Sequence, residues 1–312
     1  MTSLATMPST KVRRIIYFGT PEVAVAPLQA LVATGFSVEL VVTRPDVRRG
    51  RGGEPSPSPV KRAAQNLGLR VSHSIDEAIR STENQSDVLG VVVAFGEIFK
   101  TSALQSLPII NVHFSLQPRW RGAAPVERAI LAGDKTTGVC IIRVGEALDQ
   151  GEIYASEEIE IADHDDLSTL RKKLNDLGIQ LLLQTLDSGF ASAATQVGTV
   201  TYAKKINPTD LHIDWQESSS KILRQIRVGG AFTFLKKKRV KIVSASRASA
   251  TQFAGEPGEP GELVNISKTS FDVVCGEGAI SVSRVQPEGK DQMTAEQWLN
   301  GARLKPGVRL GG

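Results

Sequence analysis

The sequence lacks several features that would place it in a specialised class of protein. It has only two cysteines in 312 residues, and no apolar run reaches the roughly 18 to 20 residues that span a bilayer. Cys140 and Cys275 lie far apart in apolar, strand-like runs without a CxxC spacing, which favours buried thiols over a disulfide and argues against a metal site. These absences favour a cytoplasmic protein without a membrane anchor.

A glycine motif for dinucleotides is also missing. The segment "FGTPE" (residues 18–22) follows the first predicted strand, where a G-x-G-x-x-G turn would lie in a dehydrogenase. Binding of NAD or FAD is therefore unsupported. The net charge of +4 permits a polyanionic partner without requiring one, so the position of the basic residues matters more than their number.

The chain is long enough for two domains. Residues 1–10 carry neither an apolar run nor a periodic pattern, and we expect them to be disordered. Strand and helix patterns alternate over residues 11–207, which predicts an α/β domain with a Rossmann-like parallel sheet. Near its end a long helix begins close to Asp165, and its leucine stripe faces the core; the stripe consists of Leu167, Leu170, Leu174, Leu177 and Leu181.

The pattern changes in residues 208–312. One helix-like piece, "SSSKILRQIRV", is followed by short strand candidates separated by turns, among them "RVKIVSAS", "SFDVVC" and "AISVSRV". Several short strands at regular spacing predict a small β-barrel.

Polar side chains stand at the end of the buried strand "LPIINVH". Asn111 and His113 are separated by one residue, so both side chains lie on one side of the strand at its C-terminal end, where open α/β sheets build their sites. Asp149, in the glycine-bracketed loop "GEALDQGEIY", could return to the same edge. The alternative is structural: an Asn that caps a turn, a His satisfied in the core and an Asp in an ordinary turn.

These residues carry a family resemblance. The segment "INVHFSLQPRWRGAAPVERAILAGDKTTGV" resembles the signature segment of the methionyl-tRNA formyltransferase family. Further matches follow in the order that the family has them: "YFGTPEVAV", "RPDVRRGRGGEPSPSPVKRAA", "VVVAFGEI", "LDQGEIY", "VTYAKKI" and "IDW". The resemblance implies an α/β formyltransferase domain over residues 11–207, followed by an OB-like β-barrel, residues 208–312, that binds tRNA.

The resemblance also implies an activity. The formyl group of 10-formyltetrahydrofolate would pass to the α-amine of methionyl initiator tRNA, for translation initiation, in a monomer that needs no metal. Asn111 and His113 would stabilise the oxyanion that develops on the formyl group, because their N–H groups bind that charge better than the planar ground state. Asp149 would orient the imidazole and position a water for proton transfer.

Binding residues follow from the same resemblance. For folate they are Ser115, Leu116, Gln117 and Pro118, together with Phe95, Gly96 and Glu97. For tRNA they are Arg48, Arg49 and Arg51 in the first domain and Lys236, Lys237, Lys238 and Arg239 in the second. The basic loop alternatively is a flexible linker, and the lysine run alternatively is a charged hairpin that keeps a sheet edge soluble.

Three residues depart from the family pattern, namely Val47, Phe114 and Gln117. Two other functions compete with the one implied. One is a folate-dependent formyltransferase acting on a small amine, such as a glycinamide ribonucleotide or an amino sugar, and the other is a catalytically silent tRNA-binding protein. The arginine loop and the basic second domain argue against the first, and the intact set of Asn111, His113 and Asp149 argues against the second.

Overall fold

The computed structural model describes residues 3–9, 11–48, 54–82, 87–249 and 258–311. Its contacts divide the chain into two compact units, and we describe each unit by itself. The first comprises residues 1–126, 136–160 and 169–204, and the second comprises 127–135, 161–168 and 205–312. Within the described residues no helix is both long and apolar enough to cross a bilayer.

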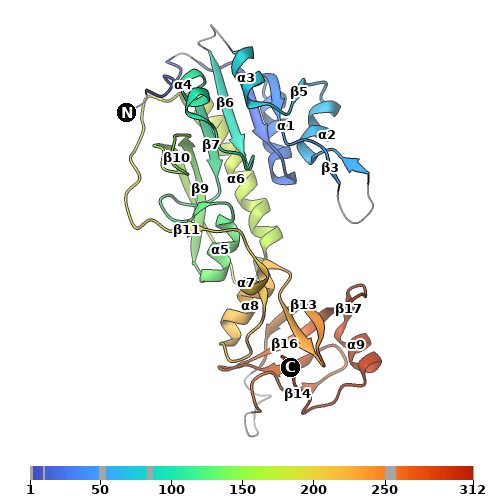
Figure 1. Ribbon diagram of the computed structural model, residues 1–312. Helices are drawn as coiled ribbons and strands as arrows, with labels where there is room; N and C mark the ends of the chain where they lie inside the picture. Colours follow the sequence, from blue (N-terminus) through green and yellow to red (C-terminus); the bar gives the residue numbers. More distant parts are fainter. Residues whose placement is uncertain (1–2, 10, 49–53, 83–86, 250–257, 312) are drawn as a thin grey trace. The chain divides into compact units, whose positions relative to one another are not determined.

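The first unit is built on a seven-stranded sheet (Figure 1). Its strands, in spatial order, are β10 (Ile153–Glu160), β9 (Thr136–Arg143), β7 (Ile109–His113), β6 (Val88–Val93), β1 (Arg14–Gly19), β2 (Ser37–Val42) and β5 (Val71–Ser72). The five strands from β7 to β5 are parallel, whereas β9 is antiparallel to β7 and to β10. The predicted Rossmann-like α/β fold is confirmed, and the antiparallel edge is an addition that the strand pattern did not reveal.

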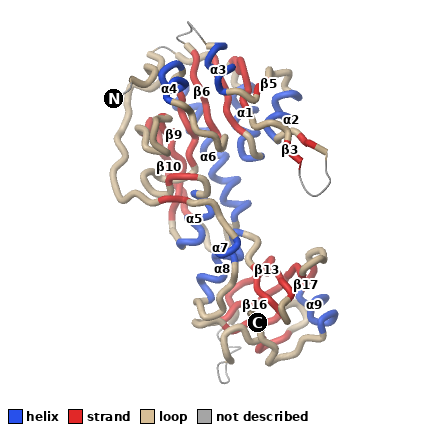
Figure 2. Tube along the Cα trace, in the orientation of Figure 1, coloured by secondary structure: helices blue, strands red, loops and turns tan. Residues whose placement is uncertain are grey.

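Helices flank this sheet (Figure 2). They are the short η1 (Glu22–Ala24), α1 (Val25–Ala33), α2 (Pro59–Asn66), α3 (Ile75–Ser81), α4 (Thr101–Ser106) and α6 (Leu167–Ser188). Most of α5 (Pro125–Ala132) belongs to the second unit. Ser58 caps α2 by accepting the backbone N–H of Lys61, and the next residue is a proline, which suits a first helical position. The strand β6 is buried along its whole length, as a strand covered on both faces requires.

The leucine stripe of α6 is partly core. Leu170, Leu174 and Leu181 are buried, whereas Leu167 and Leu177 are half-buried. Gly178 lies on the same face, and a side chain there would meet Val112 of β7. This helix therefore approaches the strand that carries Asn111 and His113 closely.

Short strands and the N-terminal segment complete the unit. The strands are β3 (Val47–Arg48), β4 (Pro55–Ser56), β8 (Arg121–Gly122) and β11 (Tyr202–Ala203). The N-terminal segment, for which the sequence predicts no order, contacts the body of the unit: the N–H of Ala5 donates to the carbonyl of Leu104, 2.8 Å away, and Leu4 packs against the core. These contacts join residues far apart in the sequence, so no local sequence pattern predicts them.

The second unit is an antiparallel curled sheet with its own core. Its strands are β12 (Phe232–Leu235), β13 (Lys238–Arg247), β16 (Ala279–Pro287), β15 (Phe271–Val274) and β14 (Leu263–Ile266) in spatial order, with β17 (Met293–Thr294) paired to β16. The helices are α7 (Pro208–Leu211), α8 (Ser219–Val228) and α9 (Ala295–Ala302). Trp215, Phe271 and Trp298 belong to its core cluster. The curled antiparallel sheet confirms the predicted barrel-like class.

Candidate active site

Asn111 and His113 lie at the C-terminal end of β7. Val92 of β6 pairs with Asn111 on one side, and Ile142 of β9 pairs with it on the other. His113 is 5% exposed, whereas Asn111 is half-buried. Within the part of the chain that the structure describes, the Asn111 amide makes no hydrogen bond, so its N–H donors remain open to a substrate.

Asp149 reaches His113 by a route that the sequence did not indicate. Because β9 is antiparallel to β7, its last residue, Arg143, pairs with Ile110 near the start of β7. The loop 144–152 must therefore run back along β7 to bring Asp149 beside His113. Gly151 makes the tight return possible, since a side chain there would collide with the carbonyl of Arg143.

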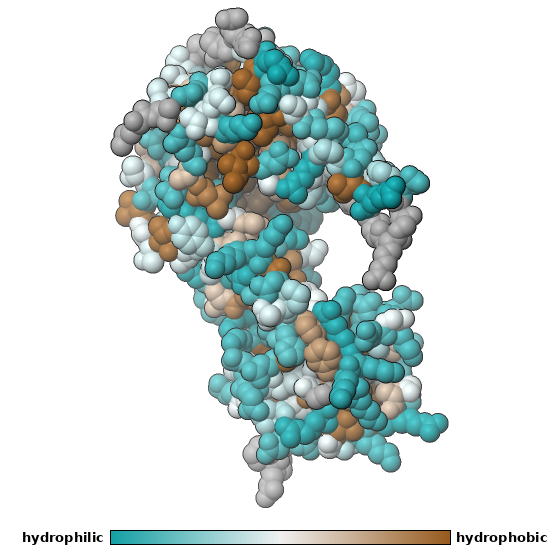
Figure 3. Space-filling model, viewed as in Figure 1, coloured by the Kyte–Doolittle hydropathy of each residue, from teal (hydrophilic) through white to brown (hydrophobic). Residues whose placement is uncertain are grey.

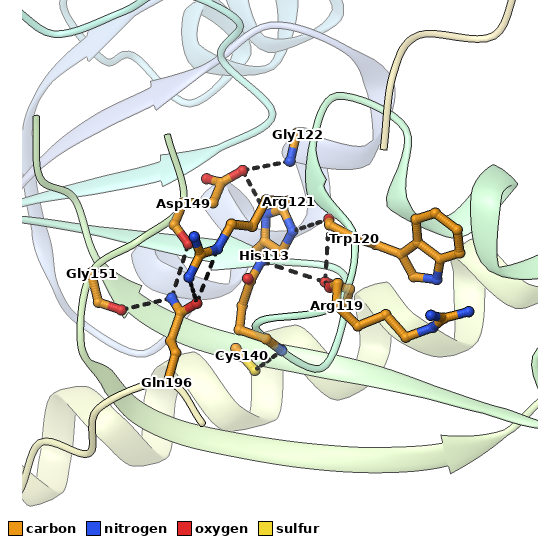
Figure 4. Close-up of polar contacts among 11 residues, drawn as sticks. His113, Arg119, Trp120, Arg121, Gly122, Cys140, Asp149, Gly151 and Gln196 are labelled. Atoms are coloured by element: carbon orange, nitrogen blue, oxygen red, sulfur yellow. Dashed lines mark hydrogen bonds and ion pairs between the residues drawn. The ribbon is translucent and has the colours of Figure 1, made fainter. Parts of the chain in front are cut away.

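The side chains of His113 and Asp149 face each other (Figure 4). Oδ2 of Asp149 lies 3.7 Å from Nδ1 of His113, and both side chains are largely buried, at 12% and 5% exposure. The same Oδ2 accepts the backbone N–H of Gly122 at 2.7 Å. On the other side of the ring, Nε2 lies 3.0 Å from the carbonyl of Trp120. Both nitrogens of the imidazole therefore face oxygen acceptors.

The loop from residue 114 to 122 is tied together by its own polar groups. The hydroxyl of Ser115 donates to the carbonyl of Arg119 at 2.6 Å, and Trp120 has a left-handed backbone with φ of 62°. The N–H of Gln117 donates to Sγ of Cys140, 3.4 Å away, on β9. Burial raises the pKa of the Cys140 thiol to about 11, so this group stays protonated at neutral pH and is a packing residue.

The expected folate residues are distributed unevenly. Ser115, Gln117 and Pro118 are buried within the loop, and Leu116 packs against Gly138 of β9. The carbonyl oxygen Oε1 of Gln117 is buried and has no hydrogen-bond partner among the described residues, so it is an acceptor that a ligand N–H could satisfy. Phe114 turns its ring toward Gly178 of α6.

The segment 94–98 behaves differently from the loop. Its backbone is left-handed at Ala94 and Gly96, with φ of 48° and 77°, and the carbonyl of Gly96 accepts the Arg44 guanidinium at 2.6 Å. The ring of Phe95 is core, 5.5 Å from the ring of Phe18. Glu97 is exposed. What this segment can offer a planar ligand is therefore mainly backbone N–H groups.

The expected tRNA residues fall into two groups. Arg48 is exposed on β3, and Arg49 and Arg51 lie outside the described residues. Lys236, Lys237 and Lys238 are exposed at the hairpin that joins β12 to β13. The face of the second unit seen in Figure 3 is mostly hydrophilic.

Arg239 differs from the three lysines, because its guanidinium carbon stacks 3.7 Å from the ring centroid of Phe232. Its Nε atom is buried without a hydrogen-bond partner among the described residues. The side chain thus packs against its own sheet in addition to carrying a charge.

Gln196 and Thr201 are contacts of the site that the sequence patterns did not indicate. Nε2 of Gln196 donates to the carbonyls of Asp149 and Gly151, at 2.9 and 2.8 Å. Thr201 accepts the N–H of Trp120 through its hydroxyl at 2.9 Å and is followed by β11, which pairs with β8. The residues 194–203 form no long helix or strand, so hydrophobic periodicity gave no sign of this role.

The described residues contain no cluster of three His, Cys, Asp or Glu side chains arranged to hold a metal ion. The side chains at the end of β7 supply an amide with open donors, an imidazole between two oxygens and a largely buried carboxylate. Such a set can bind a developing oxyanion and shuttle a proton.

Comparison with known proteins identifies the class. The family model "Formyl transferase" matches residues 13–186, and "Formyl transferase, C-terminal domain" matches residues 205–303. Curated relatives named methionyl-tRNA formyltransferase include those of Jannaschia sp. (strain CCS1) and Symbiobacterium thermophilum. Each is 39% identical over 95% of this chain, covering 99% and 95% of the relative.

Solved structures agree on the fold. An N-formyltransferase from Helicobacter canadensis, in complex with folinic acid and dTDP-3-aminofucose, aligns with a TM-score of 0.63 at 19% identity, over 88% of this chain and 99% of that one. HypX from Aquifex aeolicus, in complex with tetrahydrofolic acid, aligns with a TM-score of 0.63 at 12% identity over 93% of this chain. The alignment spans about half, 47%, of that longer protein.

The chain therefore belongs to the formyl transferase family. Its full-length similarity is to the methionyl-tRNA formyltransferases of that family.

Proposed function

We propose that the chain transfers the formyl group of 10-formyltetrahydrofolate to the α-amino group of methionyl initiator tRNA, for translation initiation in the cytoplasm. The observation that carries the proposal is the similarity of 39% identity over nearly the whole length to methionyl-tRNA formyltransferases. The pairing of His113 with Asp149 at the end of β7 supplies a matching chemical site.

Three side chains divide the work. The Asn111 amide donates to the oxyanion that develops on the formyl group, because its donors are open and its strand is held between two others. His113 is the second donor, and it is oriented by Asp149 on one nitrogen and by the Trp120 carbonyl on the other. Asp149, largely buried beside the ring, holds the imidazole in place and positions a water for proton transfer.

The transfer makes one bond, breaks one bond and moves one proton. The methionyl nitrogen forms a bond to the formyl carbon while the bond from that carbon to N10 of the folate breaks. The proton that leaves the amine passes to N10, with His113 and the water at Asp149 as its carriers. No covalent bond to the protein is needed, which suits a site whose one thiol, Cys140, stays protonated.

The basic hairpin at Lys236–Lys238 and the exposed Arg48 support a nucleic-acid acceptor, because contacts to phosphate need charge without sequence-specific geometry. The buried Oε1 of Gln117 and the backbone of residues 94–98 support a polar, planar formyl donor. We propose that a monomer carries out the reaction.

One assay tests the function. The purified full chain is incubated with 10-formyltetrahydrofolate and, in separate reactions, with methionyl initiator tRNA, glycinamide ribonucleotide and an amino-sugar nucleotide. We expect formylation of the tRNA alone. Formylation of a small amine would instead establish the small-amine enzyme, and the absence of all turnover would leave a tRNA-binding protein.

A further inference from the structure

Gln196 turns its side chain inward, although it lies in a segment whose other side chains are exposed to solvent. In residues 191–200, all of which the structure describes, its side chain is half-buried while the other nine are exposed. Two residues before it, Ala194 is paired to Ile153 at the start of β10 by two backbone hydrogen bonds of 2.8 and 2.9 Å. The backbone is thus anchored where Gln196 turns inward.

Every polar atom of the Gln196 amide is used. Its Nε2 donates to the carbonyls of Asp149 and Gly151, and its Oε1 accepts both Nε and Nη2 of Arg121, at 3.2 and 2.6 Å. Arg121 is 8% exposed and begins β8, whose next residue is Gly122. The amide therefore joins residues 149–151, which carry Asp149, to residues 121–122, whose Gly122 N–H binds the Asp149 carboxylate (Figure 4).

Asp149 needs such support. Its φ of 51° lies in the left-handed region, which is unfavourable for a non-glycine residue and persists only where the surroundings hold it. Gln196 holds the carbonyl of Asp149 itself, and through Arg121 it holds the strand whose Gly122 N–H binds Oδ2. A change in either contact would move the carboxylate away from Nδ1 of His113.

We propose that Gln196 is a positioning residue for Asp149: it sets the backbone that aims the carboxylate at His113. This inference rests on the proposed function, because it assigns Gln196 a role only if Asp149 has one. Glutamine suits the position because its one amide supplies donors for two carbonyls and an acceptor for Arg121. A glutamate would keep the acceptor and lose both donors.

Kinetics of the full chain with methionyl initiator tRNA test the proposal. Gln196→Ala should lower kcat about tenfold to a hundredfold with little change in KM for tRNA, since misplacement of a catalytic group by about 1 Å has effects of this size. Gln196→Glu should be at least as damaging, although its carboxylate still binds Arg121. Wild-type kcat in Gln196→Glu would overturn the proposal, because Gln196 would then serve only to brace Arg121.

A double-mutant cycle separates positioning from general stability. In an Asp149→Asn background, Gln196→Ala should lower kcat no further, because it acts through a carboxylate that is already gone. If the two effects multiply instead, Gln196 acts independently of Asp149 and the proposal fails. Should Gln196→Ala not fold, Gln196→Glu takes its place in the cycle.

The chain offers a matched control in Gln225, whose Nε2 likewise bridges two carbonyls two residues apart, those of Asp210 and His212. Gln225→Ala should leave kcat unchanged, and a decrease equal to that of Gln196→Ala would show that any such bridge matters. The Asp149→Asn variant tests the proposed function separately. If it alone keeps full activity, the catalytic assignment is wrong, whereas full activity of Gln196→Ala beside an inactive Asp149→Asn overturns only the role of Gln196.

Discussion

Asn111 and His113, two residues apart on one strand, have different surroundings. The amide of Asn111 makes no hydrogen bond within the described residues, whereas each nitrogen of His113 already faces an oxygen. Asn111 is thus a preformed donor, because its backbone is already held in the sheet by strands on both sides. His113 is a donor only where a substrate oxygen replaces or joins the Trp120 carbonyl.

We expect Asn111→Ala to lower kcat by about a hundredfold or more, the usual effect of removing one donor to an oxyanion. His113→Ala and Asp149→Ala should be comparably damaging. Asn111→Asp is the sharper variant, because it keeps the shape and removes the N–H donors. Steady-state kinetics check the result, with unchanged thermal unfolding as the control, and near-normal turnover of a folded His113→Ala protein would contradict the assignment.

At the scale of an element, the hairpin of β12 and β13 has an unusual turn. Leu235 pairs with Lys238, so Lys236 and Lys237 form a two-residue turn, and both have positive φ, of 50° and 64°. This is the geometry of a type I′ turn, for which Asn-Gly is favoured. A lysine at either position costs about 1 kcal/mol, because its side chain disfavours positive φ. The two lysines lie at positions where stability favours other residues, which is expected if their charge has a use.

The double substitution Lys236→Asn with Lys237→Gly should therefore change stability and binding in opposite directions. We expect a higher melting temperature of the second unit, because the turn is relieved of strain. We also expect several-fold weaker tRNA binding, with a log–log salt slope lower by somewhat under one for each phosphate that the protein no longer neutralises. Calorimetry and binding at several salt concentrations measure the two effects.

A matched variant separates local from general charge. Lys290→Gln with Lys305→Gln removes two exposed charges from the same unit without touching the turn. It should leave the salt slope nearly unchanged. Equal weakening by both double variants would mean that only net charge counts, and higher stability with unaltered binding at Lys236 and Lys237 would assign the hairpin to solubility.

At the scale of the whole molecule, the second unit is more than the C-terminal part of the chain. It also includes residues 127–135 and 161–168, and arginine side chains join both segments to the residues after 204. Arg128 forms a bidentate pair with Asp210, with N–O distances of 2.8 and 2.9 Å, and this hydrogen bonding lowers the pKa of the Asp210 carboxyl. From α8, Arg224 donates to the carbonyl of Leu131 and Arg227 donates to that of Asp165.

A fragment of residues 205–312 would lack these partners. We expect its α8 amides to exchange hydrogen faster than in the full chain, because Arg224 and Arg227 lose the carbonyls that hold the helix. The amides of β15 and β16, which lie among the core strands of the same unit, should keep their protection and serve as the control. Equal protection of α8 in fragment and full chain would show that residues 127–135 and 161–168 add nothing to this unit.

Local patterns in the sequence were sufficient for many of the longer elements and for part of the site, whereas α3, α4, α9 and β12 were not predicted. Alternation and buried runs predicted the strands, and the three-and-four spacing predicted α6, because both depend on residues close in the chain. The place of Asn111 and His113 at a strand end followed from the same local pattern. The family resemblance extended this to Asp149, and the function that it implies agrees with the curated relatives.

Only the tertiary structure decided the contacts made through space. The antiparallel pairing of β9, and hence the return of the loop that carries Asp149, depends on which strand neighbours β7 rather than on any periodicity in residues 136–152. The inward turn of Gln196 and the stacking of Arg239 on Phe232 likewise have no local signature. Hydrophobic patterns record which face of an element is buried, whereas a polar side chain in an irregular segment acquires its role only when folding brings its partners within hydrogen-bonding distance.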